Sequence, residues 1–281
     1  MKVLVGTIAL LSTSLVWGLT NFWGQSQAVS WQPPTLAQSP SQNPASPDLS
    51  LLARASMAFV QSDRYQTDSI MEVTGTTSDQ TFKAGVQATT IVQSPKQFRA
   101  EIAYNQPDKA GLVNILVVGD GQQVWIYRAD TQQYTVKSYE DFEQLDDSYF
   151  IGISSLLFMQ LPPADRQVIA QGALADSQVV QDLGLLSNPN FKGAPQWVNN
   201  QSLYAYEFLN AQDGFTLDAF VDPTTADLKQ LRISGQDQQV DYAITETIRR
   251  RTANPFVTDS TFRFTPPVGA RRVESVAIGP L

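Results

Sequence analysis

Residues 117–136, VVGDGQQVWIYRADTQQYTV, constrain the fold more than any other stretch of the chain. They predict two β-strands joined at Asp120-Gly121, because this dipeptide readily adopts the positive φ angles of a tight hairpin turn. The second strand, residues 124–127, is apolar on both faces. A sheet with one face in water would alternate apolar and polar side chains. Other parts of the chain must therefore cover both faces of this strand.

The first 28 residues have the pattern of a secretory signal peptide. Lys2 forms a short positive region, residues 3–19 are mostly apolar, and residues 26–28 supply the small side chains of a cleavage site. Cleavage here predicts export with no stable membrane insertion afterwards. An uncleaved inner-membrane anchor is the weaker alternative, because a 17-residue apolar stretch is at the short limit for crossing a bilayer.

The composition excludes several kinds of chemistry. Loss of Lys2 with the signal peptide leaves 18 basic and 27 acidic residues, a net charge of −9, which disfavours nucleic acid as a partner. The chain has no Cys and no His, so thiol chemistry, most nucleophilic triads and ordinary zinc sites are excluded. We therefore expect no enzyme, no metal site and no cofactor.

Residues 29–47, rich in Pro, Ser and Gln, predict a linker, and we expect a single folded domain over residues 48–281. Asp48 is placed to cap a helix that reaches Val60 with apolar residues at helical spacing. Strand patterns separated by turn residues follow in two series. The predicted strands are residues 69–76, 81–94, 97–104, 112–118, 123–128 and 134–137, then 202–210, 214–221, 227–234, 240–249 and 261–266.

A helical stretch separates the two series. Residues 150–172 predict a short apolar helix, a break at Pro162-Pro163 and a second helix over residues 164–171. Residues 179–187 fit either a strand end or a helical turn. The order of helix, strands, helices and strands predicts a mainly β protein of the α+β class. We expect one long, curved antiparallel sheet with helices on one face.

Three segments resemble motifs of the LolA-like periplasmic lipoprotein carriers. Residues 119–133 resemble the family's hairpin motif, residues 261–269 (TFRFTPPVG) its closing strand, and residues 94–100 (SPKQFRA) its Arg-Pro-x-x-Phe-x-Trp segment. The resemblance implies an unclosed half-barrel, as in LolA and LolB, with a helical lid over a hydrophobic cavity. The arginine that latches this lid in the family corresponds to Ser94 here, and the tryptophan corresponds to Ala100, as in a distant relative.

The resemblance suggests two sets of functional side chains. Each set has an alternative as ordinary core packing, because a cavity and a core use the same residue types. The predicted cavity wall comprises Phe98, Ile115, Val117, Trp125 and Tyr127, and the predicted lid comprises Phe150, Ile153, Leu157 and Met159. Strand alternation separates Trp125 and Tyr127 from Val124 and Ile126, and the sequence leaves open which pair faces inward.

Two charged runs are expected to lie in water, as runs of charge usually do. They are the acidic cluster Glu140, Asp141, Glu143, Asp146 and Asp147, and the strand-end run Arg249-Arg250-Arg251.

The expected function is a non-catalytic periplasmic protein that holds lipid or lipoprotein acyl chains, for transport across the periplasm. The alternative is an envelope sensor or regulatory module that binds a protein partner and fills its cavity with its own side chains.

Overall fold

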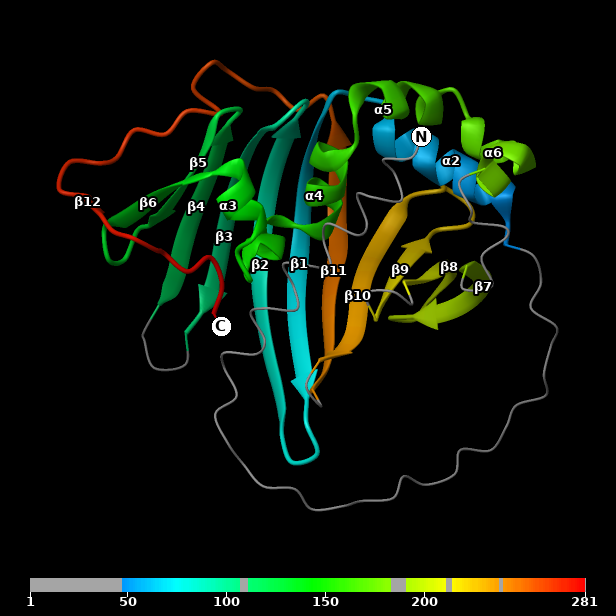
Figure 1. The fold of residues 1–281 in the computed structure, drawn as a ribbon, viewed down its shortest axis with the longest axis horizontal. Helices are drawn as coiled ribbons and strands as arrows, with labels where there is room; N and C mark the ends of the chain where they lie inside the picture. The colour runs from blue at the N-terminus through cyan, green and yellow to red at the C-terminus, as the bar shows by residue number, and fades with distance from the viewer. Residues whose placement is uncertain (1–46, 107–110, 183–190, 211–213, 238–239, 281) are drawn as a thin grey trace.

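Twelve strands form one curved sheet in the computed structural model, with helices against one of its faces (Figure 1). The spatial order is β12-β6-β5-β4-β3-β2-β1-β11-β10-β9-β8-β7, so the sheet is open, with β12 and β7 at its edges. All neighbouring strands are antiparallel except β12 and β6. The structure describes residues 47–106, 111–182, 191–210, 214–237 and 240–280.

Along the chain, the strands fall into a group before and a group after the helical stretch. The first group forms one side of the sheet and β7–β11 form the other, while β12 returns to the first side and pairs with β6. The first group is β1 (Arg64–Thr76), β2 (Thr81–Gln93), β3 (Gln97–Asn105), β4 (Leu112–Asp120), β5 (Gln123–Arg128) and β6 (Gln133–Ser138). The second group is β7 (Phe191–Val198), β8 (Gln201–Asn210), β9 (Phe215–Val221), β10 (Leu228–Asp237), β11 (Val240–Ala253) and the two-residue β12 (Arg271–Arg272).

Strand alternation decides which side chains face the helices. Along most of β1, every second residue is buried, as expected for a strand with one face against the core. The predicted turn at Asp120-Gly121 is confirmed. Gly121 has a φ of 98°, and the Asp120 carboxylate accepts hydrogen bonds from the backbone amides of Gln122 and Gln123, at 2.8 and 2.9 Å.

The predicted helices are confirmed at both positions. Those that were predicted are α2 (Leu49–Val60), α4 (Ile153–Gln160) and α5 (Pro163–Ala170). The structure adds α3 (Tyr139–Glu143) within the acidic cluster, the 3₁₀ turns η1 (Ser148–Ile151) and η2 (Ala173–Ala175), and α6 (Ser177–Asp182). Asp48 caps α2 by accepting from the Leu51 amide at 2.9 Å. In Figure 1, α3 and α4 lie over the middle of the sheet, while α2, α5 and α6 gather near one end.

The main core lies between the concave face of the sheet and these helices. It combines inward side chains from β1–β5, β10 and β11 with α3, η1, α4 and residues of the C-terminal segment. A smaller cluster joins α2 to β8 and β9 through Leu51, Ala55, Tyr206 and Val221. One helix layer therefore covers most, but not all, of the concave face.

The prediction of a strand over residues 261–266 is wrong. This segment pairs with no strand and instead lies across the outer face of β5 and β6. The ring of Phe264 is 5.7 Å from that of Trp125 and 5.5 Å from that of Tyr127. Pro266 and Pro267 follow directly and offer no backbone N–H for a sheet ladder. This segment therefore covers the outward face of the strand at residues 124–127, which the sequence predicted to be covered on both faces.

The sequence patterns missed two strands and left one element open. Strand β7 contains Gly193 and Pro195, which suit an edge strand and hide the strand pattern. Strand β12 is too short to leave a pattern. The region that fitted a strand end or a helical turn begins as α6, and its residues 183–187 lie outside the described part of the chain. The predicted signal peptide and nearly all of the linker also lie outside it.

Candidate functional site

Apolar side chains form a row across the concave face of the sheet. Phe208 on β8 lies opposite Leu217 on β9, and Leu217 lies opposite Ile233 on β10. Ile233 in turn lies opposite Ile244 on β11. Residues opposite one another in an antiparallel ladder share a face. Ile233 and Ile244 are fully covered, whereas Phe208 and Leu217 are only half-buried. The row thus runs from the sealed core to a partly exposed surface.

Three of the five predicted cavity residues lie together in the main core. Phe98 on β3, and Ile115 and Val117 on β4, face the helices and are 0–2% exposed. The Phe98 ring lies 5.4 Å from that of Phe142 on α3. Side chains lining a space large enough for water would keep some accessible surface, so these three are enclosed by protein. We call the concave face of β3 and β4 the sealed region.

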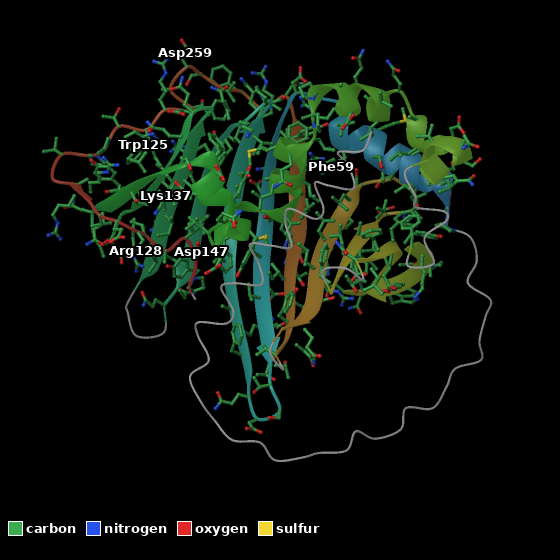
Figure 2. All side chains as sticks on the ribbon, viewed as in Figure 1. Phe59, Trp125, Arg128, Lys137, Asp147 and Asp259 are labelled. Carbon is green, nitrogen blue, oxygen red and sulfur yellow. The ribbon has the colours of Figure 1, made fainter. Side chains whose placement is uncertain are left out.

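Trp125 and Tyr127 lie apart from those three. Their strand neighbours Val124 and Ile126 are the inward pair and are fully buried in the main core. Trp125 (labelled in Figure 2) and Tyr127 face outward, against Phe264. The five residues therefore do not form one surface. Any ligand contact of Trp125 or Tyr127 stays a prediction and would have to occur on the outer face.

The predicted lid residues lie on η1 and α4, which are packed against the sheet. Phe150 and Ile153 are fully buried, while Leu157 and Met159 are half-buried against the same core. The structure thus brings this set together with Phe98, Ile115 and Val117. Whether these helices move is untested, and their role as a lid stays a prediction.

A buried carboxylate fixes the start of α4. Glu246 on β11 is fully buried on the concave face and accepts from the Ser154 amide at 2.6 Å and from the Ser154 hydroxyl at 2.9 Å. A negative group at a helix N-terminus is electrostatically favourable. Burial raises the pKa of Glu246, although the bonds from Ser154 act to lower it. A polar contact in the core therefore helps to position this helix.

Gly152 permits this close approach. Its φ of 103° lies in the region that favours glycine, and a Cβ there would lie 2.9 Å from Glu246 Oε1. The sequence offered one signal for Glu246 itself. In β11, the inward positions Tyr242, Ile244, Glu246 and Ile248 carry a single acidic residue among apolar ones.

Two arginines, the buried Arg166 and the half-buried Arg251, lie near the end of α4. Arg166 on α5 donates to the Ser94 hydroxyl, and its guanidinium lies 5.1 Å from the centre of the Phe158 ring. Arg251 lies 4.0 Å from the Phe59 ring centre and 3.8 Å from that of Tyr65, and it donates to the Phe59 carbonyl at 3.1 Å. Such stacking on aromatic faces suits a guanidinium.

These contacts correct the expectation that Arg251 lies in a solvated charge run. Burial lowers the pKa of Arg251 to about 10. Ser94 also gains a role, since its hydroxyl accepts a hydrogen bond from Arg166 of the helical layer. Arg166 lies on the same face of α5 as Ile169, three residues away, and both are buried. The sequence did not reveal it because a buried helix face is expected to carry apolar residues.

The acidic cluster is not uniformly solvated either. Asp147 is half-buried, and one of its carboxylate oxygens accepts from the backbone amides of Ile278 and Gly279, at 2.6 and 3.2 Å. Burial raises its pKa, and the two amide bonds oppose this. The expectation of a fully solvated loop is therefore wrong at Asp147.

One part of the concave face of β8 and β9, around Phe208 and Leu217, differs from the sealed region, and we call it the open region. Farther along the same two strands, Tyr206 and Val221 are covered by α2. In the open region, the side chains of Phe208 and Leu217 are half-buried, as are Leu157 and Met159 on the helix α4. Leu209, next to Phe208, points to the opposite face of the same strand and is 37% exposed. The open region is where apolar surface of the concave face remains accessible.

The described residues show neither a metal site nor a membrane span. No group of three or more acidic side chains among them is arranged to hold a metal ion. No helix in the described ranges is both long enough and apolar enough to cross a membrane.

Comparisons with known proteins find only weak similarity, and only to solved structures. No protein-family model matches it, and no curated protein matches it in sequence. LprF from Mycobacterium bovis has 12% identity and a TM-score of 0.40, with 77% of this chain and 100% of that chain covered. A LolA superfamily protein from Nitrosomonas europaea has 11% identity and a TM-score of 0.31, with 78% and 99% covered.

The MucA/MucB complex of Pseudomonas aeruginosa is also similar, at 10% identity and a TM-score of 0.29, with 77% of this chain and 60% of that chain covered. Structures of the superfamily that the sequence motifs resemble are thus among the similar ones. At these TM-scores, no activity is transferred from them.

Proposed function

We propose that the chain binds an apolar ligand, the acyl chain of a lipid or lipoprotein, on the concave face of its sheet without catalysing a reaction. The proposed location is the periplasm, in accord with the predicted signal peptide. The observation that supports this most is the apolar row that begins at half-buried Phe208 and Leu217 and continues into the sealed core. An acyl chain extending along this row would transfer its surface from water to apolar side chains.

The energetics of this mode depend on burial rather than on directional bonds. Each buried CH₂ group contributes about 0.8 kcal/mol, so a ten-carbon stretch contributes roughly 8 kcal/mol before the entropic cost of binding is subtracted. Neither Cys nor His is needed for such binding, and the chain has none. Binding of this kind discriminates weakly between acyl chains of similar length.

The helix α4 acts as a lid in this proposal. Access to Phe98, Ile115 and Val117 requires α4 or its neighbours to move, because these side chains are enclosed. Helix α4 is short, with only eight residues, and its N-terminus is held by the polar contact with Glu246. Polar contacts of this kind are exchanged for bonds with water when a helix moves, which favours reversible opening.

The test is direct measurement of acyl-chain binding to the purified chain without residues 1–28. We expect native mass spectrometry to show a co-purified lipid that solvent extraction releases, and we expect the delipidated protein to bind cis-parinaric acid. The Phe208→Glu variant should bind this probe at least about tenfold more weakly, because a charge then lies in the apolar row.

Leu209→Glu is the matched control, since the same charge is introduced one residue away on the opposite face. It should retain wild-type affinity. A delipidated chain that does not bind the probe would disprove the proposal, and equal effects of the two substitutions would disprove the location of the site.

A second candidate function is a protein-binding module that senses or regulates an envelope partner. The complete enclosure of Phe98, Ile115 and Val117 favours it, because this half of the sheet is filled by the protein's own side chains. The two functions are separated by the same measurement. A protein-binding module would show neither co-purified lipid nor saturable probe binding.

A further inference from the structure

The C-terminal segment, residues 273–280, packs into the concave face of the sheet. Val276 and Ile278 are buried in the main core, in the same cluster as Phe98, Ile115 and Val117, whereas Ala277 between them is exposed. The segment (red in Figure 1) leads from β12 back toward β3, where the Tyr104 hydroxyl donates to the Gly279 carbonyl at 3.2 Å. The end of the chain therefore supplies part of the cover of the sealed region.

Gly279 lies directly against one of the predicted lid residues. A Cβ at this position would overlap the ring of Phe150, which is itself fully buried. The close approach of this backbone to the ring requires a residue without a side chain. A residue with a side chain at position 279 would therefore keep residues 273–280 from packing in this position.

The seated segment is held mainly by side-chain contacts rather than by a strand ladder. The Val273 amide donates to the Tyr134 carbonyl, the last bond between backbone groups that the described chain makes before its end. Beyond it, Thr135 donates to the Glu274 carbonyl at 2.9 Å, and the carboxylate of Asp147 (labelled in Figure 2) accepts from the amides of Ile278 and Gly279. All of these groups can bond to water instead when the segment leaves.

We propose that residues 273–280 are an exchangeable occupant of the apolar site and compete with the acyl chain for the sealed region. The proposal rests on the proposed function and adds a regulation to it. Three observations carry it: the apolar contacts of Val276 and Ile278, the fit of Gly279 on Phe150, and the anchor at Asp147. Release of residues 273–280 breaks no strand pairing of the described sheet, because β12 ends at Arg272.

The first experiment compares binding of cis-parinaric acid by the full-length mature chain and by a chain that ends at Arg272. The truncated chain should bind at least tenfold more tightly, and a peptide of residues 271–280 added in trans should reverse the gain. The same peptide with Ile278→Glu should not compete. Circular dichroism and thermal melting establish that the truncated chain is folded.

Gly279→Ala tests the same step in the full-length chain. It should raise probe affinity toward that of the truncated chain, because the added methyl group cannot be seated against Phe150. Ala277→Ser is the matched control, as residue 277 points to solvent in the same segment. Equal affinity of wild type, truncated chain and Gly279→Ala would overturn the proposal while leaving the proposed function intact. Failure of every chain to bind the probe would overturn both.

Hydrogen exchange of the unaltered protein gives a result even if the truncated chain does not fold. The amides of Ile278 and Gly279 should exchange at least a hundredfold faster than those of Ile102 and Ile115 in the central strands, because local release exposes them without global unfolding. Equal protection of the two sets would show that the segment is a fixed part of the core and would overturn the proposal.

Discussion

The sealed and open regions belong to one sheet but are covered differently. In the sealed region, side chains from α3, η1 and the C-terminal segment enclose Phe98, Ile115 and Val117. In the open region, Phe208 and Leu217 keep part of their surface accessible, although their register continues the same apolar row. The difference teaches that the fold itself does not determine whether a ligand fits. The parts of the chain that cover the sheet decide it.

The largest expected contrast is in the stability cost of removing one aromatic ring from each region. Phe98→Ala should lower the free energy of unfolding by about 3–5 kcal/mol, because it leaves a cavity in a filled core. Phe208→Ala should cost less, about 1–2 kcal/mol, since part of its side-chain surface is already accessible to solvent. Urea denaturation of both variants measures the difference. Equal costs would show that the two regions are equally packed.

A second contrast uses two glycines with positive φ. Gly152→Ala combines backbone strain with the collision at Glu246, and we expect a loss of about 2–3 kcal/mol. At Gly214, which precedes β9, no heavy atom of the described residues lies within 4 Å of a built Cβ, so Gly214→Ala should show strain alone, about 1 kcal/mol.

The additional loss of stability in Gly152→Ala, compared with Gly214→Ala, measures how strongly the Glu246 carboxylate restrains α4. Limited proteolysis should also cut the Gly152→Ala variant faster near α4 than the Gly214→Ala variant. If the two glycine variants lose equal stability and resist protease equally, Glu246 does not restrain the helix.

The smallest expected contrast is a pH dependence. Because burial raises the pKa of Glu246 above its ordinary value near 4.5, its contribution to stability is fully present below that value and is lost as the pH rises through the raised pKa. Glu246→Gln should remove this loss, which for one proton amounts to at most about 1.4 kcal/mol per pH unit. Asp147 keeps its own contribution in both proteins, so the difference isolates Glu246.

Urea denaturation at a series of pH values from 5 to 9 measures this difference. The wild type should lose stability relative to the Gln variant as the pH rises. Parallel stability curves would show that Glu246 keeps an ordinary pKa and does not couple α4 to pH.

Much of the fold could be predicted because period-two burial and turn chemistry act locally. The hairpin at Asp120-Gly121, the cap at Asp48 and the helices between the two strand series follow from neighbouring residues alone. The two missed strands and the wrong one over residues 261–266 have a different cause. Whether a short extended segment pairs with a strand or lies across a sheet depends on contacts distant in sequence, such as that of Phe264 with Trp125.

The candidate site could be predicted only in part, for a related reason. Burial of Phe98 and Ile153 follows from their apolar character, but the charged residues that position the helices resemble solvated ones in the sequence. Asp147 and Arg251 each belong to a run of like charges whose other members lie nearer to solvent. A short window of sequence does not reveal which charge of such a run faces the core.

The central claim is that an acyl chain binds along the concave face, beginning at the open region. The most direct measurement is photo-crosslinking with a fatty acid that carries a diazirine in its chain, followed by peptide mapping. We predict saturable labelling of peptides that contain Phe208, Leu217 and α4, with competition by unlabelled fatty acid. Labelling confined to the outer face around Trp125 and Phe264, or labelling that does not saturate, would contradict the account.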